Sequence, residues 1–315
     1  MKIAILDDYQ NVARDMTDWS GLEADHDLTF FHDIYEGLDG FAKRLEPFDI
    51  LCIMRERSPI GRDLIERLPN AKLFVTAGMR NAAIDLDACK ERGIPVLGTG
   101  GSAQSTPELA WGMMLSLARN IHIENARMRE GAWITTLGTD MQGKTLGILG
   151  LGRLGTRMAQ IAKAFDMKVI AWSQNLTDEK AAEAGATRVD KVDLFAQADF
   201  ITIHYKLGER SRGLVGAAEL ACMKPTAYLV NTSRGPIVDT QALIAALTEG
   251  RIAGAGIDVY DAEPLAPDHP IRKCPRTLLT PHLGYVTDGT YRAFYGQIVE
   301  SLESWLAGNP IRVLA

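Results

Sequence analysis

A glycine-rich hexapeptide near the middle of the chain, Gly150-Leu151-Gly152-Arg153-Leu154-Gly155, has the spacing of a phosphate-binding turn. An apolar run precedes it, and a helical pattern follows from Arg153. In such a strand–turn–helix unit, Gly150 allows the tight turn, Gly152 lets the backbone approach a pyrophosphate, and Gly155 lets the helix pack on the strand. The first N–H groups of the helix, at Arg153 and Leu154, would face the anion. The motif predicts a dinucleotide site, and an ordinary glycine turn is the alternative.

The next strand of this unit, 168–172, ends where an NAD site usually places a carboxylate against the adenosine ribose. Here the sequence reads Trp172-Ser173-Gln174-Asn175, and no acid follows until Asp178. Either NAD is held weakly or the site tolerates a 2′-phosphate. We therefore expect NAD or NADP as cofactor, with Ser173 in the cofactor site and NADPH used at least as well as NADH.

Alternating strands and helices position these residues. Apolar runs at 2–6, 50–54, 72–76 and 95–97 read as buried strands, and helical patterns lie between them. A second alternation begins at Lys144, with strand candidates at 145–149, 168–172, 200–204, 227–230, 254–259 and 277–280. The pattern predicts an α/β protein of two Rossmann-like or flavodoxin-like lobes with parallel sheets and an interdomain cleft. We expect a substrate domain from residues 1–99 and 287–315, the latter a returning helix, and an NAD(P)-binding domain from 100–286.

Three further motifs follow the glycine turn in order: Asn231-Thr232-Ser233-Arg234-Gly235, then Gly256-Ile257-Asp258-Val259-Tyr260-Asp261-Ala262-Glu263-Pro264, then Thr280-Pro281-His282-Leu283-Gly284. Together the four motifs resemble the D-isomer-specific 2-hydroxyacid dehydrogenase family, and the resemblance extends over the whole chain. It implies an NAD(P)-dependent oxidoreductase that interconverts a small 2-oxo acid and its D-2-hydroxy acid by hydride transfer. The motifs are specific for the family and not for a substrate.

The resemblance also implies a role for each motif position. Arg234 would bind the carboxylate and carbonyl of the oxo acid, for which a guanidinium fork is suited. His282 would be the general acid/base, paired with and oriented by Glu263. The cofactor set would include Thr232, Asp258 near the nicotinamide carboxamide, and His282. In the first domain, the backbone of Gly78, Met79 and Arg80 matches a loop that receives the substrate carboxylate. None of the remaining histidines has metal-ligand spacing, so we expect no metal.

Two positions depart from the family pattern. Tyr285 follows Gly284, where many relatives carry a small residue, which predicts a narrower mouth to the site. Tyr205-Lys206-Leu207 stands where relatives often have a proline near the adenine, and Lys206 is either a solvated charge or a neighbour of a 2′-phosphate.

Two other functions fit parts of the sequence. A formate dehydrogenase-like enzyme typically pairs its histidine with glutamine, so Glu263 speaks against that function. A dinucleotide-sensing, corepressor-like binding protein keeps the catalytic residues too. The long flanking tails of those corepressors are not seen here, and turnover of an oxo acid would separate the three.

Composition narrows the class of partner. The 315 residues carry 34 Lys and Arg against 40 Asp and Glu, a net charge of −6 without a dense basic run, so neither nucleic acid nor a membrane surface is expected. Four widely spaced cysteines and the absence of a signal-like N-terminus predict a cytoplasmic protein. Residues 122–141, with apolar Trp133 and Ile134, resemble the family's dimer arm and predict a homodimer.

Overall fold

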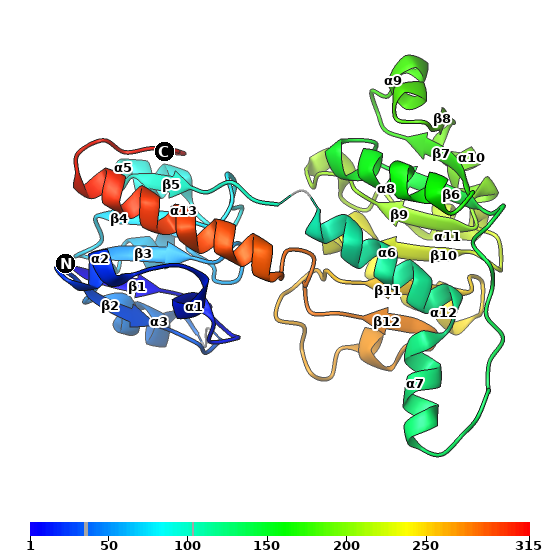
Figure 1. Ribbon diagram of the computed structural model, residues 1–315, viewed down its shortest axis with the longest axis horizontal. Coiled ribbons are helices and arrows are strands. Elements are labelled where there is room, and N and C mark those ends of the chain that lie inside the picture. The colour runs from blue at the N-terminus through cyan, green and yellow to red at the C-terminus, as the bar shows by residue number, and fades with distance from the viewer. Residues whose placement is uncertain (35–36, 103) are drawn as a thin grey trace. The chain divides into compact units, whose positions relative to one another are not determined.

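The computed structural model describes residues 1–34, 37–102 and 104–315, so Ala103, close to the predicted domain boundary, lies outside the described residues. The chain divides into two compact units, Met1–Ser102 with Thr287–Ala315, and Ala103–Val286. Each unit is built on its own parallel sheet (Figure 1). The predicted α/β fold with two parallel-sheet domains is confirmed.

Unit 1 contains a five-stranded sheet in the order β2-β1-β3-β4-β5. Its strands are β1 (Lys2–Ile5), β2 (Asp27–Phe30), β3 (Ile50–Ile53), β4 (Leu73–Thr76) and β5 (Val96–Gly98). The inner strands β3 and β4 are buried along their whole length. Continuous apolar runs are what strands covered on both faces require, which is why the sequence revealed them.

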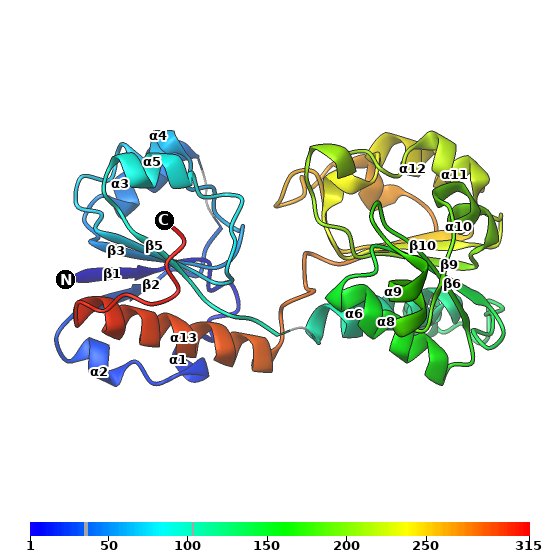
Figure 2. The same ribbon diagram turned by 90° about the horizontal axis from the view of Figure 1, so that it is seen from above.

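Helices cover both faces of this sheet (Figure 2). They are α1 (Ala13–Met16), α2 (Ser20–Glu23), α3 (Leu38–Leu45), α4 (Arg62–Ile65), α5 (Leu86–Glu91) and α13 (Asp288–Leu306). The long C-terminal helix α13 begins after Thr287, whose side chain caps the helix by accepting a hydrogen bond from the N–H of Thr290. It buries Phe294, Ile298 and Leu302 and contacts α1, β4 and β5 of unit 1.

Unit 2 contains a seven-stranded sheet in the order β12-β11-β10-β9-β6-β7-β8. Its strands are β6 (Thr145–Leu149), β7 (Lys168–Trp172), β8 (Thr187–Arg188), β9 (Phe200–Ile203), β10 (Tyr228–Asn231), β11 (Gly254–Ile257) and β12 (Thr277–Leu279). Its helices are α6 (Ser105–Ala118), α7 (Ile121–Arg129), α8 (Arg153–Ala164), α9 (Asp178–Glu183), α10 (Lys191–Gln197), α11 (Ala217–Cys222) and α12 (Thr240–Thr248), with short 3₁₀ turns η1 (Glu209–Ser211), η2 (Gly235–Ile237) and η3 (Pro270–Lys273). Helices α6 and α8 cover one face and α10, α11 and α12 the other (Figure 2). Because every pair is parallel, the carboxyl ends of β6, β7, β9, β10 and β11 meet at one edge.

Two edge strands were not anticipated from the sequence. Strand β2 is half-exposed and has no apolar run, and β8 is only two exposed residues long. Both are recognisable only from the strand they pair with, β1 for β2 and β7 for β8. In the described part of the chain, the helices are all too short or too polar to cross a lipid bilayer.

Candidate active site

The glycine turn joins β6 to α8 and requires glycine at two of its three positions. Gly150 has a φ of +101°, and a Cβ there would lie 2.5 Å from the carbonyl oxygen of His204. A Cβ on Gly155 would lie 2.2 Å from the carbonyl oxygen of Gly150, so the helix packs directly on the turn. A Cβ on Gly152 would meet nothing within 4 Å. The turn therefore leaves open space beside Gly152, where backbone could approach a ligand.

The residues around this turn fit a pyrophosphate-bearing cofactor. Helix α8 begins after Gly152, and among the described residues no side chain caps its first N–H groups, which include those of Arg153 and Leu154. Uncapped N–H groups at a helix start attract an anion. Thr232, predicted to contact the cofactor, is buried, and its hydroxyl has no partner among the described residues. A buried hydroxyl without a partner is costly unless a ligand supplies one.

The predicted acid–base pair, Glu263 and His282, lies at the carboxyl ends of β11 and β12. Nδ1 of His282 is 2.6 Å from Oε2 of Glu263. The other carboxylate oxygen, Oε1, accepts a hydrogen bond from the backbone N–H of Tyr260 at 2.8 Å. Glu263 is thus held at both oxygens, and one ring nitrogen of His282 is engaged. The remaining nitrogen, Nε2, is left for a reacting group, since imidazole acts through the nitrogen that its partner does not fix.

Asp258 holds the loop that carries His282. Its carboxylate accepts hydrogen bonds from the Thr280 hydroxyl at 2.6 Å and from the N–H groups of Leu283 at 2.7 Å and Gly284 at 2.9 Å. The loop needs such support because His282 has a φ of +55°, an uncommon conformation for a residue with a side chain. Burial raises the pKa of the Asp258 carboxyl, while the hydrogen bond from Thr280 opposes that rise.

Arg234 lies on a loop packed tightly against the segment that carries Glu263. A Cβ on Gly235 would lie 2.1 Å from the carbonyl carbon of Tyr260, so only glycine permits this approach. The Asn231 side chain shapes the loop by donating to the carbonyl oxygen of Arg234 at 3.0 Å and accepting from the N–H of Ser233 at 3.0 Å. The motifs that contain Arg234, Glu263 and His282 are therefore brought together at one sheet edge of unit 2.

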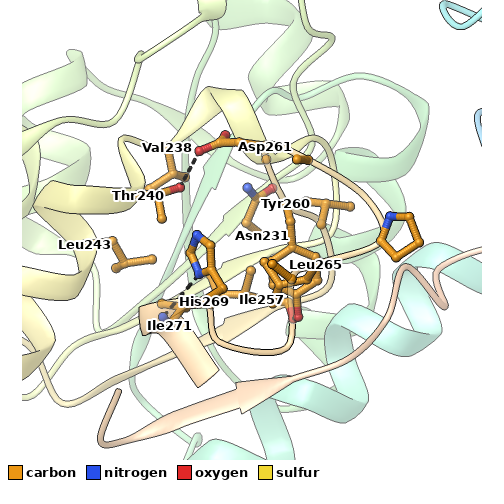
Figure 3. Close-up of a pocket in the computed structure, with 15 residues that line it drawn as sticks. Asn231, Val238, Thr240, Leu243, Ile257, Tyr260, Asp261, Leu265, His269 and Ile271 are labelled. Atoms are coloured by element: carbon orange, nitrogen blue, oxygen red, sulfur yellow. Dashed lines mark hydrogen bonds between the residues drawn. The ribbon is translucent and has the colours of Figure 1, made fainter. Parts of the chain in front are cut away.

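A cavity of about 160 Å³ lies against the segment around Glu263 (Figure 3). Its walls are largely apolar and include Leu243, Ile257 and Leu265, with the Thr240–Asp261 hydrogen bond of 2.7 Å among its lining groups. Glu263 is not among the lining residues. The cavity lies beside the segment that carries Glu263, and the carboxylate among its lining groups, that of Asp261, is bonded to Thr240.

The predicted substrate loop of unit 1 follows β4. Gly78 has a φ of +92°, and its N–H donates to the Thr99 hydroxyl at 2.8 Å. Arg55 donates from Nη1 to the carbonyl oxygen of Ala77 at 3.3 Å. Because the N–H of Gly78 is already used, an anion at this loop would have to be bound by Met79 and Arg80.

His204, which follows β9, has the environment of a histidine that supports the fold. Nε2 of His204 is 2.8 Å from the Thr202 hydroxyl, and burial lowers the pKa of His204 to about 4. Nδ1 is buried without a partner among the described residues. A neutral imidazole that contacts its own strand fits a structural role better than contact with a charged ligand.

Two hydrogen bonds that hold the site in place have no signature in the sequence. The N–H of Tyr260 fixes Glu263, and the hydroxyl of Thr106 donates to the carbonyl oxygen of Gly284 at 2.9 Å. The motif spacing gave no sign of either bond, because one comes from backbone and the other from a helix about 180 residues earlier. Asp258 was predicted as a cofactor contact, and its three hydrogen bonds show that it also supports the loop.

Comparison with known proteins gives a consistent result. Residues 111–284 match the family model described as D-isomer specific 2-hydroxyacid dehydrogenase, NAD binding domain. The chain is 37% identical over 285 residues to a glyoxylate reductase of Aeropyrum pernix, covering 87% of this chain and 84% of the relative.

Solved structures extend the similarity to the whole chain. A putative D-3-phosphoglycerate dehydrogenase from Ralstonia solanacearum superposes with a TM-score of 0.94 at 33% identity, covering 99% of this chain and 96% of the other. An acyclic imino acid reductase, solved with NADPH and D-Arg, has a TM-score of 0.79 at 26% identity over the full length of both chains.

Proposed function

The chain belongs to the D-isomer-specific 2-hydroxyacid dehydrogenase family, a family of NAD-dependent oxidoreductases, and we propose that Arg234, Glu263 and His282 carry its chemistry. The observation that supports this most strongly is the His282–Glu263 pair, with Nδ1 and Oε2 2.6 Å apart and the second carboxylate oxygen held by backbone. The reaction is the interconversion of a small 2-oxo acid and its D-2-hydroxy acid.

In the proposed mechanism His282 moves the proton. A bound nicotinamide cofactor supplies the hydride for reduction or accepts it in oxidation. In reduction, Nε2 of a protonated His282 donates to the carbonyl oxygen of the substrate, and Glu263 stabilises the imidazolium and fixes the ring. In oxidation, the neutral ring accepts the hydroxyl proton at Nε2, while Nδ1–H remains bonded to Glu263. Arg234 binds the carboxylate and polarises the carbonyl, because a guanidinium presents two parallel donors to planar oxygens.

The two units have separate proposed roles. Unit 2 is the NAD(P)-binding domain, in which the turn Gly150–Gly155 and the start of α8 hold the pyrophosphate, with Thr232 and Ser173 as further cofactor contacts. Unit 1 is the substrate domain, and its loop after Gly78 binds the substrate carboxylate through Met79 and Arg80, because the N–H of Gly78 is bonded to Thr99. The uncapped start of α8 and the positive φ of Gly78 support these assignments.

We propose a small 2-oxo acid such as glyoxylate or hydroxypyruvate as substrate, since the relative in Aeropyrum pernix is a glyoxylate reductase. The test is NAD(P)H consumption with glyoxylate, hydroxypyruvate, pyruvate and phenylpyruvate in parallel. Turnover with glyoxylate or hydroxypyruvate above the other two supports the proposal. NAD⁺ reduction by formate would favour the formate dehydrogenase alternative, and cofactor binding without any turnover would favour the dinucleotide-sensing one.

We further propose that the protein is a homodimer formed through α7 and the segment that follows it. Helix α7 buries none of its residues, and Trp133, Ile134 and Leu137 are 74%, 78% and 94% exposed. Large apolar side chains that are exposed close together in the sequence mark an interaction surface. The four free cysteines, three of them buried, support our proposal of a reducing compartment such as the cytoplasm.

A further inference from the structure

Two hydroxyl groups border the glycine turn: that of Ser173, which follows β7, and that of Tyr205, which follows β9. Strand β6 carries the turn and lies between β7 and β9, and its last residue, Leu149, pairs with Trp172 on one side and Ile203 on the other. The residues after β7 and after β9 therefore flank the turn. In a Rossmann unit the adenosine ribose is bound at the end of the second strand, which corresponds to β7 here.

Backbone N–H groups occupy an acceptor position on each of these hydroxyls. The N–H of Leu151, within the glycine turn, donates to Oγ of Ser173 at 2.9 Å. The N–H of Gln174 donates to the hydroxyl oxygen of Tyr205 at 3.1 Å. A hydroxyl has a single hydrogen to donate. Neither hydrogen has an acceptor within the described residues, so both are available to a group that only accepts hydrogen bonds.

The Tyr205 ring is fixed in this position from a second direction. It stacks on Trp172 with ring centroids 6.0 Å apart and an interplanar angle of 17°. The side chain thus reaches from the end of β9 to the end of β7, and its hydroxyl is held by the backbone of the residue after Ser173. A fixed donor loses little conformational entropy when a ligand binds.

The nearest acid in sequence after β7 is engaged elsewhere. Oδ1 of Asp178 lies 3.4 Å from Nη1 of Arg188. Residues 173–177 contain only neutral side chains, and the residue after Tyr205 is the exposed Lys206. A ribose diol is best held by a carboxylate that accepts from both hydroxyls, whereas a phosphate is best held by donors.

We propose that Tyr205 is a specificity-determining residue for the cofactor, and that its hydroxyl, together with that of Ser173, selects a nucleotide carrying a 2′-phosphate. The inference rests on the proposed cofactor site and goes beyond it by naming the residue from β9 that reads the ribose. A hydrogen bond to a charged acceptor typically changes affinity by about tenfold or more.

The test is calorimetric binding of two adenosine fragments, 2′,5′-ADP and 5′-ADP, to the wild type and to Tyr205→Phe. The Phe ring keeps the stack on Trp172 and removes only the hydroxyl. We expect 2′,5′-ADP to bind the wild type more tightly, and Tyr205→Phe to weaken it about tenfold while 5′-ADP changes by less than about twofold. Tyr228→Phe is the matched control, because Tyr228 is also half-buried and stacked, on Phe200 at 5.3 Å, and should alter neither affinity.

Four results would overturn the inference. Equal weakening of both fragments would make Tyr205 a wall of the adenine site only. Unchanged or tighter binding of 2′,5′-ADP would show that its hydroxyl contributes nothing or that its side chain obstructs the ligand. Failure of the wild type to bind either fragment or NADH would refute the cofactor site itself, whereas tight NADH binding without a preference for 2′,5′-ADP would refute only the role of Tyr205.

Discussion

The backbone N–H of His282 donates a hydrogen bond to the backbone carbonyl oxygen of Asp258 at 2.7 Å. The same aspartate binds the loop on either side of His282 through its carboxylate. One residue at the end of β11 thereby fixes a histidine that follows β12. The proposed general acid is thus positioned by a residue at the end of the adjacent strand, in addition to the hydrogen bond from its N–H to the carbonyl oxygen of Thr280 at 3.1 Å.

We expect Asp258→Asn to loosen this loop. An amide has one acceptor oxygen, and its NH₂ would face N–H and O–H donors, so at least one of the three hydrogen bonds is lost. Turnover should fall at least about tenfold, and the free energy of unfolding by about 1–3 kcal/mol. Steady-state kinetics and urea unfolding measure the two effects. Asp193→Asn, an exposed aspartate on α10, is the matched control, and equal behaviour of the two variants would contradict the role given to Asp258.

Asp7 in unit 1 should make stability depend on pH. Burial raises its pKa from 3.8 to about 6, although Ser58 and Arg57 lower it, and Oδ2 has no partner in the described part of the chain. A raised folded-state pKa stabilises the fold below pH 3.8, and that contribution is lost as the pH rises through about 6.

Relative to Asp7→Asn, which cannot ionise, the wild type should therefore lose about 3 kcal/mol of unfolding free energy between pH 3 and pH 8. Urea unfolding of both proteins across this range measures the difference. A difference that stays constant with pH would show that the carboxyl ionises as freely in the folded chain as in the unfolded one.

Cofactor preference should respond to a charge at the end of β7. In Ser173→Asp the carboxylate can still accept from the N–H of Leu151, and it adds the charge that repels a 2′-phosphate. We expect the wild type to use NADPH at least as well as NADH, and the variant to shift the ratio of kcat/KM toward NADH. A wild type that prefers NADH by more than about 30-fold, about 2 kcal/mol, would show that a group other than residue 173 binds the ribose.

The proposed dimer interface, formed by the exposed apolar residues after α7, can be tested by measuring the oligomeric state. Light scattering should give twice the 34.5 kDa chain mass for the wild type and the monomer mass for Trp133→Asp, since a charge in the centre of an apolar interface is unpaired after association. Val192→Asp is the control, because Val192 is 62% exposed but lies on α10. A wild type that remains monomeric at micromolar concentration would rule out the dimer.

The local motifs of the site were predictable from the sequence, whereas the hydrogen bonds that hold these motifs in place were not. The turn at Gly150 could be identified because a strand, three glycines and a helix lie within some twenty residues. The expected strand at 254–259 ends earlier, at Ile257, and the carboxylate of the next residue, Asp258, binds the loop after β12. The bond from Gln174 to Tyr205 joins residues that follow β7 and β9, the two strands on either side of β6, and no periodic pattern encodes such a contact.

The proposal that His282 is the general acid/base is tested most directly with the variant His282→Ala. Its turnover of the best 2-oxo acid is measured, together with NAD(P)H binding to the same protein. Removing a general acid typically lowers the rate by about 10²- to 10⁴-fold. We predict a loss in that range, with the affinity for the cofactor nearly unchanged. Turnover equal to that of the wild type would contradict the mechanism.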